Sequence, residues 1–223
     1  MKKIFALCLA FVLVLSLCAC GTNSETPTDN PSTESTPSSS VSDTTSTNEN
    51  TADVKVDYTA PTALSSDFMD YTFRLEGDLY TLPVPVSEFV NNGWELADDV
   101  NTISANSTKK LLGTLKKGEL ALAIEVKNFS SVEKDINDVM VVGVWITEFD
   151  VGKGVDFELS GGIKPGVSVD AFKAANDMSK FTEESLSTGG TEYSHFEPSN
   201  RAYLTFKEGK LVEVSAQKYT LNK

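Results

Sequence analysis

The chain has almost none of the residues that form covalent cross-links or bind transition metals. Its 223 residues include three cysteines, all within the first twenty positions, and a single histidine, His195. The part that follows residue 20 therefore has no disulfide, no thiolate zinc site and no cysteine nucleophile. A serine–histidine–acid triad or a histidine–metal site would have to be built around His195.

Basic residues are scarce as well. The chain has 19 Lys and Arg against 32 Asp and Glu, which gives a formal net charge of −13. From Asp57 onward, 16 bases against 26 acids leave a charge of −10. Such a surface repels phosphate backbones and anionic lipid head groups, so we expect no nucleic-acid partner.

A single long apolar run is present, and it lies at the N-terminus. Lys2 and Lys3 precede an apolar stretch at residues 4–17, and small residues follow it. A basic start, an apolar core and small residues in this order are typical of an export signal. The run is too short to span a bilayer comfortably.

The end of this run, Leu17-Cys18-Ala19-Cys20, resembles the lipobox of bacterial lipoproteins. The resemblance implies that residues 1–19 are removed as a signal peptide and that Cys20 carries the lipid. The membrane would then be a partner through this anchor, and the protein would lie on the extracytoplasmic face of the cell membrane. Cleavage leaves 17 bases against 32 acids, a charge of −15. An ordinary signal peptide that contains cysteines is the alternative.

Residues 20–56 consist of the lipidated cysteine and a stretch rich in Ser, Thr and Pro. This composition has too little apolar surface to offset the loss of chain entropy, so the segment is predicted to be a disordered tether. The predicted folded part begins at residue 57.

The folded part is predicted to be an α+β domain. Residues 71–75 and 79–82 read as a hairpin, and alternating apolar residues predict a strand at 119–127. Residues 139–149 are apolar on both faces, so this predicted strand is expected either to be central in its sheet or to have its second face in contact with another element. Short helices are expected after Ser87 and after Ser168, each serine serving as an N-cap. Because the order of elements recurs, we expect two similar halves, residues 57–150 and 151–223. The predicted fold is a tandem repeat of short helices packed on one face of antiparallel β-sheet.

Two sequence patterns resemble known families. Gly77 to Pro83 and Asn92-Gly93-Trp94 are similar to uncharacterised lipoproteins of Gram-positive bacteria. Gly162 to Gly166, Tyr193 and the stretch 203–212 resemble small outer-membrane-assembly lipoproteins and the tandem fold of β-lactamase inhibitor proteins. The resemblance implies a fold rather than an activity, and it implies an exposed sheet face that receives a protein partner.

No catalytic residue is assigned, and neither a metal nor a cofactor is expected. His195 lies on an alternating stretch and is interpreted as a surface or packed residue. Asp98-Asp99 and Glu183-Glu184 are the candidate carboxylates for a cell-envelope hydrolase, but adjacent residues of a strand point apart. Solvated surface charge is therefore the favoured interpretation of both pairs.

Strand alternation predicts one functional surface. The apolar residues expected to face the helices are Leu120, Leu122, Ile124, Val126, Met140, Val142, Val144, Ile146, Ala202, Leu204, Phe206, Val212, Val214 and Ala216. Four side chains are then placed on the opposite, outer face as partner-binding residues: Trp145, Arg201, Tyr203 and Tyr219. Trp, Tyr and Arg are the types enriched in interface hot spots.

The sequence therefore favours a non-enzymatic binding module, anchored by lipid, whose outer sheet face meets a cell-surface protein or polymer. A carboxylate-dependent envelope hydrolase and a structural spacer without a ligand are the alternatives.

Overall fold

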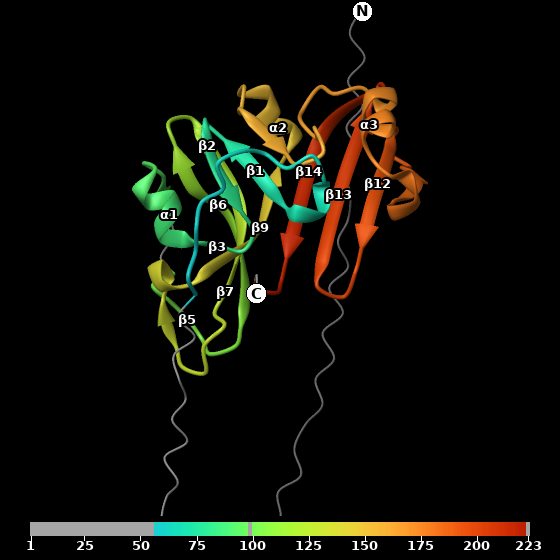
Figure 1. Cartoon of the computed structure of the whole chain (residues 1–223). Coiled ribbons are helices and arrows are strands. Elements are labelled where there is room, and N and C mark those ends of the chain that lie inside the picture. The colour runs from blue at the N-terminus through green and yellow to red at the C-terminus, as the bar shows by residue number, and fades with distance from the viewer. Residues whose placement is uncertain (1–55, 98–99, 222–223) are drawn as a thin grey trace, which may run out of the picture. The chain divides into compact units, whose positions relative to one another are not determined.

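The computed structural model describes residues 56–97 and 100–221, and these residues all belong to one compact unit. They form mainly antiparallel β-sheet, in sheets of nine, three and two strands (Figure 1). The predicted signal peptide, Cys20 and all of the predicted tether except residue 56 lie outside the described residues.

The large sheet has eight strands in one path, and a ninth strand joins it beside β9. In spatial order the eight are β11 (Thr182–Ser185), β12 (Thr191–Phe196), β13 (Asn200–Lys207), β14 (Lys210–Lys218), β9 (Met140–Ile146), β7 (Leu120–Lys127), β6 (Thr108–Lys117) and β4 (Glu95–Leu96), and the ninth is β3 (Val84–Pro85). The strand β9 is central, which is one of the two predicted alternatives, since β14 and β7 flank it.

The smaller sheets and the helices complete the described part. The three-stranded sheet is β10 (Phe157–Leu159), β1 (Thr72–Leu75) and β2 (Asp78–Thr81), and the two-stranded sheet is β5 (Thr102–Ile103) and β8 (Lys134–Asp135). The α-helices are α1 (Val86–Asn91), α2 (Glu148–Gly152) and α3 (Val169–Ala175). Three single turns of 3₁₀-helix are η1 (Phe68–Asp70), η2 (Ile136–Asp138) and η3 (Met178–Lys180).

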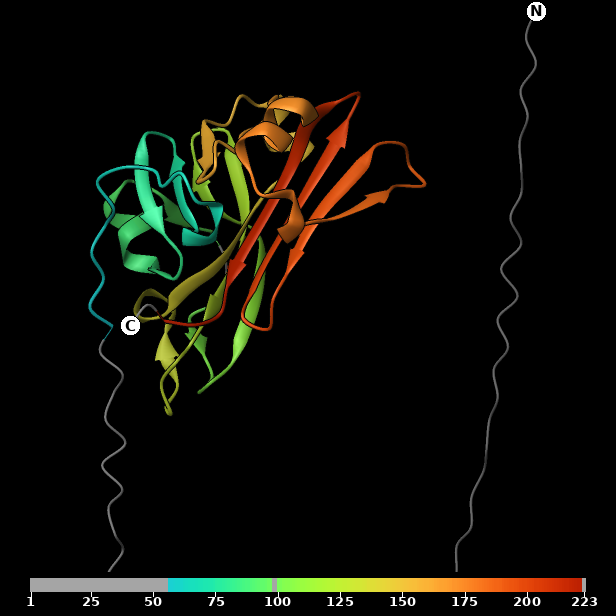
Figure 2. The same cartoon turned by 45° about the vertical axis from the view of Figure 1, so that its right-hand side comes forward.

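The predicted tandem repeat of short helices packed on one face of antiparallel sheet is wrong. The three α-helices have six, five and seven residues, too few to cover nine strands. The three-stranded sheet also covers part of the large sheet, and this small sheet lies on one side of the large one in both views (Figures 1 and 2). It joins the two predicted halves, because β10 of the second pairs with β1 of the first. The predicted boundary at residue 150 falls inside α2.

Aromatic side chains fill the space between the two layers. Tyr80 of β2 stacks on Phe89 of α1, with 4.4 Å between ring centroids. Phe172 of α3 packs against Tyr193 of β12 and Phe206 of β13. The covered side of the large sheet is called the inner face here, and the opposite side is the outer face.

Most local predictions for individual elements are confirmed. The hairpin is β1 and β2, every second residue of β7 is buried, and the Ser168 side chain caps α3 by accepting a hydrogen bond from the Ala171 amide. Ser87 is not a cap, because α1 begins one residue earlier and its N-cap is Pro85. The strand predicted to reach residue 149 ends at Ile146, where Thr147 and Asp150 form a capping box that starts α2.

Two β-bulges change which residues face the core. The register between β7 and β9 shifts between Glu125 and Val126, and Val141 takes the inward position predicted for Met140 and Val142. The register between β13 and β14 shifts after Thr205, and Leu211 replaces Val212 in the core. A bulge inserts one residue and reverses the alternation beyond it.

Candidate functional site

Trp145 and Tyr203 lie in one row across the outer face of the large sheet. Ser215 of β14 pairs with Trp145 of β9 on one side and with Tyr203 of β13 on the other. Since neighbouring strands are about 4.8 Å apart, the two aromatic residues start about 10 Å apart at the backbone. Only the small Ser215 side chain lies between them, so the outer face of the sheet has a depression between the two aromatic residues.

Arg201 lies in the next row. This row consists of Gly143 on β9, Gln217 on β14 and Arg201 on β13. Both rows contain a small residue beside large ones, and a shallow groove of about 360 Å³ results. Trp145, Arg201 and Tyr203 all line this groove. The structure therefore brings three of the four predicted partner-binding residues together.

The floor of the groove is polar. Thr205, Ser215 and Gln217 line the groove and are buried, with at most 8 % of their surface exposed. The Gln217 amide Nε2 donates a hydrogen bond of 2.6 Å to the Ser215 hydroxyl. Glu192 of β12 and Glu213 of β14 also line the groove. Both are opposite Thr205 of β13, one on each side.

Trp145 lies flat along its own strand. A methyl group built on Gly143 would lie 3.0 Å from Cζ3 of the indole, so the ring covers this glycine closely. The Lys110 ammonium of β6 lies over the ring, 3.9 Å from its centroid. Glycine at 143 thus lets the indole lie against the sheet, and the Lys110 ammonium forms a cation–π contact with the ring.

Arg201 lies between two aromatic rings. The guanidinium carbon is 4.9 Å from the Phe196 ring centroid and 5.5 Å from that of Tyr219. Tyr219, the fourth predicted residue, therefore contacts the groove through Arg201. Its hydroxyl donates a hydrogen bond of 2.8 Å to Glu125. Burial, and then this hydrogen bond, raise the pKa of Tyr219 to about 12, so the phenol remains a donor at neutral pH.

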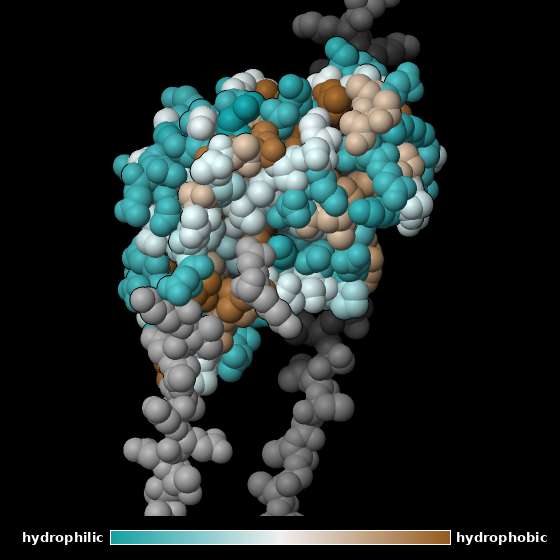
Figure 3. Space-filling view, in the orientation of Figure 1, coloured by the Kyte–Doolittle hydropathy of each residue, from teal (hydrophilic) through white to brown (hydrophobic). Residues whose placement is uncertain are grey.

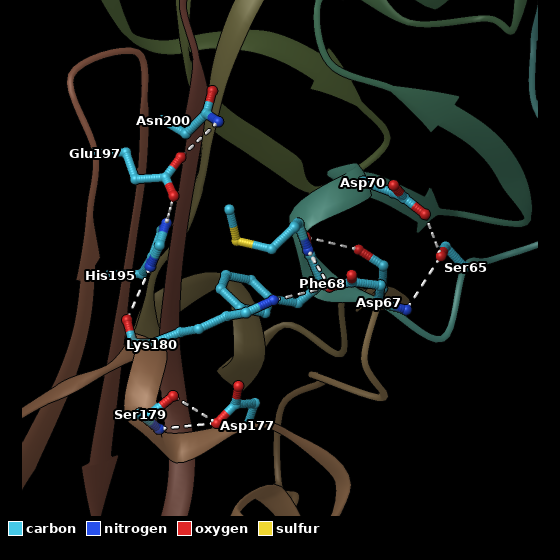
Figure 4. Close-up of polar contacts among 12 residues, drawn as sticks. Ser65, Asp67, Phe68, Asp70, Asp177, Ser179, Lys180, His195, Glu197 and Asn200 are labelled. Carbon is cyan, nitrogen blue, oxygen red and sulfur yellow. Dashed lines mark hydrogen bonds and ion pairs between the residues drawn. The ribbon is translucent and has the colours of Figure 1, made fainter.

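His195 belongs to the core and not to the groove. It lies on β12 opposite Ala202, is 5 % exposed, and has its ring edge-on to Phe68 of η1. Nδ1 is 2.8 Å from the Lys180 carbonyl oxygen, and Nε2 is 3.7 Å from a Glu197 carboxylate oxygen (Figure 4). Because Nδ1 faces a carbonyl, it carries the proton and donates. Of the two positions that the sequence left open, surface or packed, the structure shows the packed one.

The acid pairs chosen from the sequence do not converge. Glu183 pairs with Tyr193 and Glu184 with Glu192, so the two neighbours point to opposite faces. Glu183 also binds Lys173 of α3 at 3.2 Å. Asp98 and Asp99 lie outside the described residues.

The carboxylates that do share a groove, Glu192 and Glu213, were missed in the sequence. They are separated along the chain by a whole strand, and only the register between strands places them around Thr205. Gln217 and Lys110 were missed for the same reason. An alternation argument assigns a face to each strand but not the position at which neighbouring strands align.

A second groove, of about 390 Å³, has a lining that includes Lys127, Asn128 and Asp138. Hydrophilic and intermediate residues dominate the side that carries the small sheet, with hydrophobic ones in scattered spots (Figure 3). Across residues 56–97 and 100–221, no three His, Cys, Asp or Glu side chains are grouped so as to hold a metal ion. Among the helices of this same part, none has the length and apolar character needed to cross a bilayer.

Comparison with known proteins adds no relative: no protein-family model matches the chain, and neither a curated protein nor a solved structure matches it.

Proposed function

We propose that this protein is a non-enzymatic binding module, held on the extracytoplasmic face of the cell membrane by a lipid on Cys20. Its groove on the outer sheet face would bind a polymer or protein of the cell envelope. One observation carries the proposal: Trp145, Arg201 and Tyr203 from two non-neighbouring strands line a single groove. Binding energy at protein surfaces is concentrated in these residue types.

The form of the groove also supports binding. Its aromatic and cationic residues surround buried polar ones, which is the usual composition of a site that orients a ligand through a few polar groups. His195 points to the inner face and takes no part in the groove.

One observation favours a hydrolase as the second candidate. Glu192 and Glu213 lie on either side of Thr205, with their backbones about 10 Å apart across two strand spacings. Carboxyl groups of inverting glycosidases are separated by roughly 6.5–9.5 Å, so two converging side chains could reach that range.

The binding test uses the full-length protein, purified in detergent and mixed with envelopes of the producing bacterium. We expect Trp145→Ala and Tyr203→Ala each to lower the affinity for the envelopes by about tenfold or more, as the loss of a hot-spot residue does. Phe149→Ala is the matched control, because Phe149 is 69 % exposed and outside the groove lining. Equal retention of all four proteins would refute the binding role and favour a spacer without a ligand.

Two further arms separate the remaining possibilities. If the protein is a hydrolase, the wild type should release soluble sugar from these envelopes, and Glu192→Gln and Glu213→Gln should abolish the release. Cys20→Ser should move the protein from the membrane fraction to the medium or the wall fraction. A Cys20→Ser protein that remains with the membrane would contradict the anchor.

A further inference from the structure

Arg201 differs from the other arginine of the chain in having no acidic partner. Arg74 binds Glu158 at 2.9 Å and Asp156 at 3.5 Å. No carboxylate of the described residues lies within 4.0 Å of the Arg201 guanidinium, although the protein is strongly acidic. The Nε atoms of both arginines are buried without a hydrogen-bond acceptor, so what sets Arg201 apart is that its whole guanidinium has no carboxylate partner among the described residues.

A buried, unsatisfied donor of a charged group costs free energy, so the position of Arg201 requires an explanation. The Phe196 and Tyr219 rings offset part of this cost and hold the guanidinium in place. A planar guanidinium held at a groove is prepared to form paired hydrogen bonds with a carboxylate. Glu125, in the same row of the outer face, already accepts a hydrogen bond from Tyr219.

A second cation lies on the same face. Lys110 is placed over Trp145 by the ring alone, and no described carboxylate lies within 4.0 Å of its ammonium. A negatively charged ligand would therefore meet two available cations beside the aromatic row. This charge complementarity is confined to the surroundings of Arg201 and Lys110, because Glu192 and Glu213 line the same groove and the folded part has a charge of −10.

The position of the groove argues against an extended peptide as the ligand. It lies over β9, β14 and β13, each of which is paired on both sides. Peptides that add a strand need a free edge, where backbone amides and carbonyls are unpaired. The buried polar floor of Thr205, Ser215 and Gln217 also suits ligand hydroxyls better than the apolar anchors of an amphipathic helix.

A sugar chain fits these features together. Hexose rings have an apolar face that stacks on aromatic rings and a rim of hydroxyls that bonds to carboxylates, amides and hydroxyls. The backbones of Trp145 and Tyr203 are about 10 Å apart across β14, a spacing close to the repeat of a β-1,4-linked disaccharide. Glu192, Glu213 and Gln217 stand beside this row as partners for the hydroxyls.

We infer that the groove recognises a β-1,4-linked glycan that carries carboxylates, with sugar rings on Trp145 and Tyr203 and a carboxylate on Arg201. The inference rests on the proposed binding function and specifies its ligand. An extended envelope polymer of this kind is reachable from a membrane-anchored domain.

The test is calorimetric titration of the full-length protein with two matched tetrasaccharides. One alternates β-1,4-linked N-acetylglucosamine and N-acetylmuramic acid, and the other is the same compound with its carboxylates reduced to alcohols. We expect the acid form to bind about tenfold more tightly, as charged hydrogen bonds allow, with a preference that weakens as salt is added.

Single substitutions test whether the preference for the acid form depends on Arg201. Arg201→Gln should bind both forms equally and weakly, whereas Arg201→Lys should keep part of the preference for the acid. Lys164→Gln makes the same charge change on an exposed residue outside the groove and should keep the whole preference. Trp145→Ala should weaken both forms by a similar factor. Arg201→Lys is also a control for folding: if it keeps part of the preference for the acid while Arg201→Gln loses it, the loss does not come from replacing Arg201 as such.

The possible failures are distinguishable. Equal affinity of the wild type for both forms, or an undiminished preference in Arg201→Gln, overturns the role of Arg201. Binding of neither sugar, while envelopes are still retained through Trp145 and Tyr203, overturns the glycan and leaves the proposed binding function standing. Binding of envelope peptides in place of the sugars overturns it in the same way.

Discussion

Replacement of Gly143 by alanine tests whether Trp145 lies flat on the sheet. The added methyl group would lie 2.9 Å from the Gln217 Cγ atom and 3.0 Å from the Trp145 indole. Ordinary carbon contacts are about 3.5–4.0 Å, so both side chains must move. The strand itself cannot move aside, because β9 is paired with β14 and β7.

The net effect on stability is the sum of two opposing contributions. Overpacking of this kind typically costs about 1–3 kcal/mol. Alanine also restricts the unfolded chain, which stabilises the protein by about 0.4–1 kcal/mol where the backbone tolerates it. Gly143 is not among the glycines with positive φ, so this second contribution applies. We expect Gly143→Ala to lower the free energy of unfolding by up to about 2.6 kcal/mol, with a central value of about 1.3 kcal/mol.

Gly152 provides a matched control. It also has no positive φ, and a methyl group there would meet no atom within 4 Å. Gly152→Ala retains the effect on the unfolded chain without the clash, so it should raise the free energy of unfolding by about 0.4–1 kcal/mol. The two glycine-to-alanine changes are thus expected to have opposite signs.

Urea denaturation measures both free energies, and acrylamide quenching of tryptophan fluorescence reports the ring directly. Trp94 is 1 % exposed, so any increase in quenching of the Gly143→Ala protein belongs to Trp145. In the double variant with Trp145→Ala, part of the lost stability should return because one of the two clashes is gone. A Gly143→Ala protein as stable as Gly152→Ala, with unchanged quenching, would refute the flat position of the indole.

Two further predictions concern single hydrogen bonds. Tyr219→Phe removes the donor to Glu125 and should cost about 0.5–1.5 kcal/mol at neutral pH. The pKa of Tyr219 is about 12 in the folded protein and about 10 in the unfolded chain. The extra stability of the wild type over Tyr219→Phe should therefore be complete below pH 10 and should fall as pH rises toward 12. Denaturation of both proteins at a series of pH values measures this difference in the free energy of unfolding, and a difference that does not change with pH would contradict the prediction. Thr147→Ala removes the side chain that caps α2 and bonds to the Asp150 carboxylate, and thermal unfolding should show a loss of about 1–2 kcal/mol that Thr147→Ser largely restores. Equal stability of Thr147→Ala and wild type would show that the capping box does not hold α2.

Local elements could be predicted from the sequence because their signals are local. The alternation of β7 and the serine cap of α3 depend on neighbouring residues only, and both are confirmed. The end of β9 was misjudged because Thr147 and Phe149 are compatible with a strand, and the reciprocal bonds of Thr147 and Asp150 decide otherwise. The architecture failed for a different reason. The pairing of β10 with β1 joins segments more than eighty residues apart, which no periodicity within either segment specifies.

The positions of the two bulges explain why strand alternation placed Trp145, Arg201 and Tyr203 on the outer face. Alternation in β9 fails at Val142 and alternation in β14 fails at Val212. Val141 and Leu211 therefore join the core cluster in place of Met140, Val142 and Val212, although Met140 and Val142 are also buried. Between these points, from Gly143 to Ile146 and from Glu213 to Gln217, the pairing is continuous with no inserted residue. Trp145 and the partners of Arg201 and Tyr203 all fall in this interval. Side chains alternate between the two faces only while the register is uninterrupted. The rows of the groove lie in such a segment, so the face of each of their residues could be predicted from the sequence.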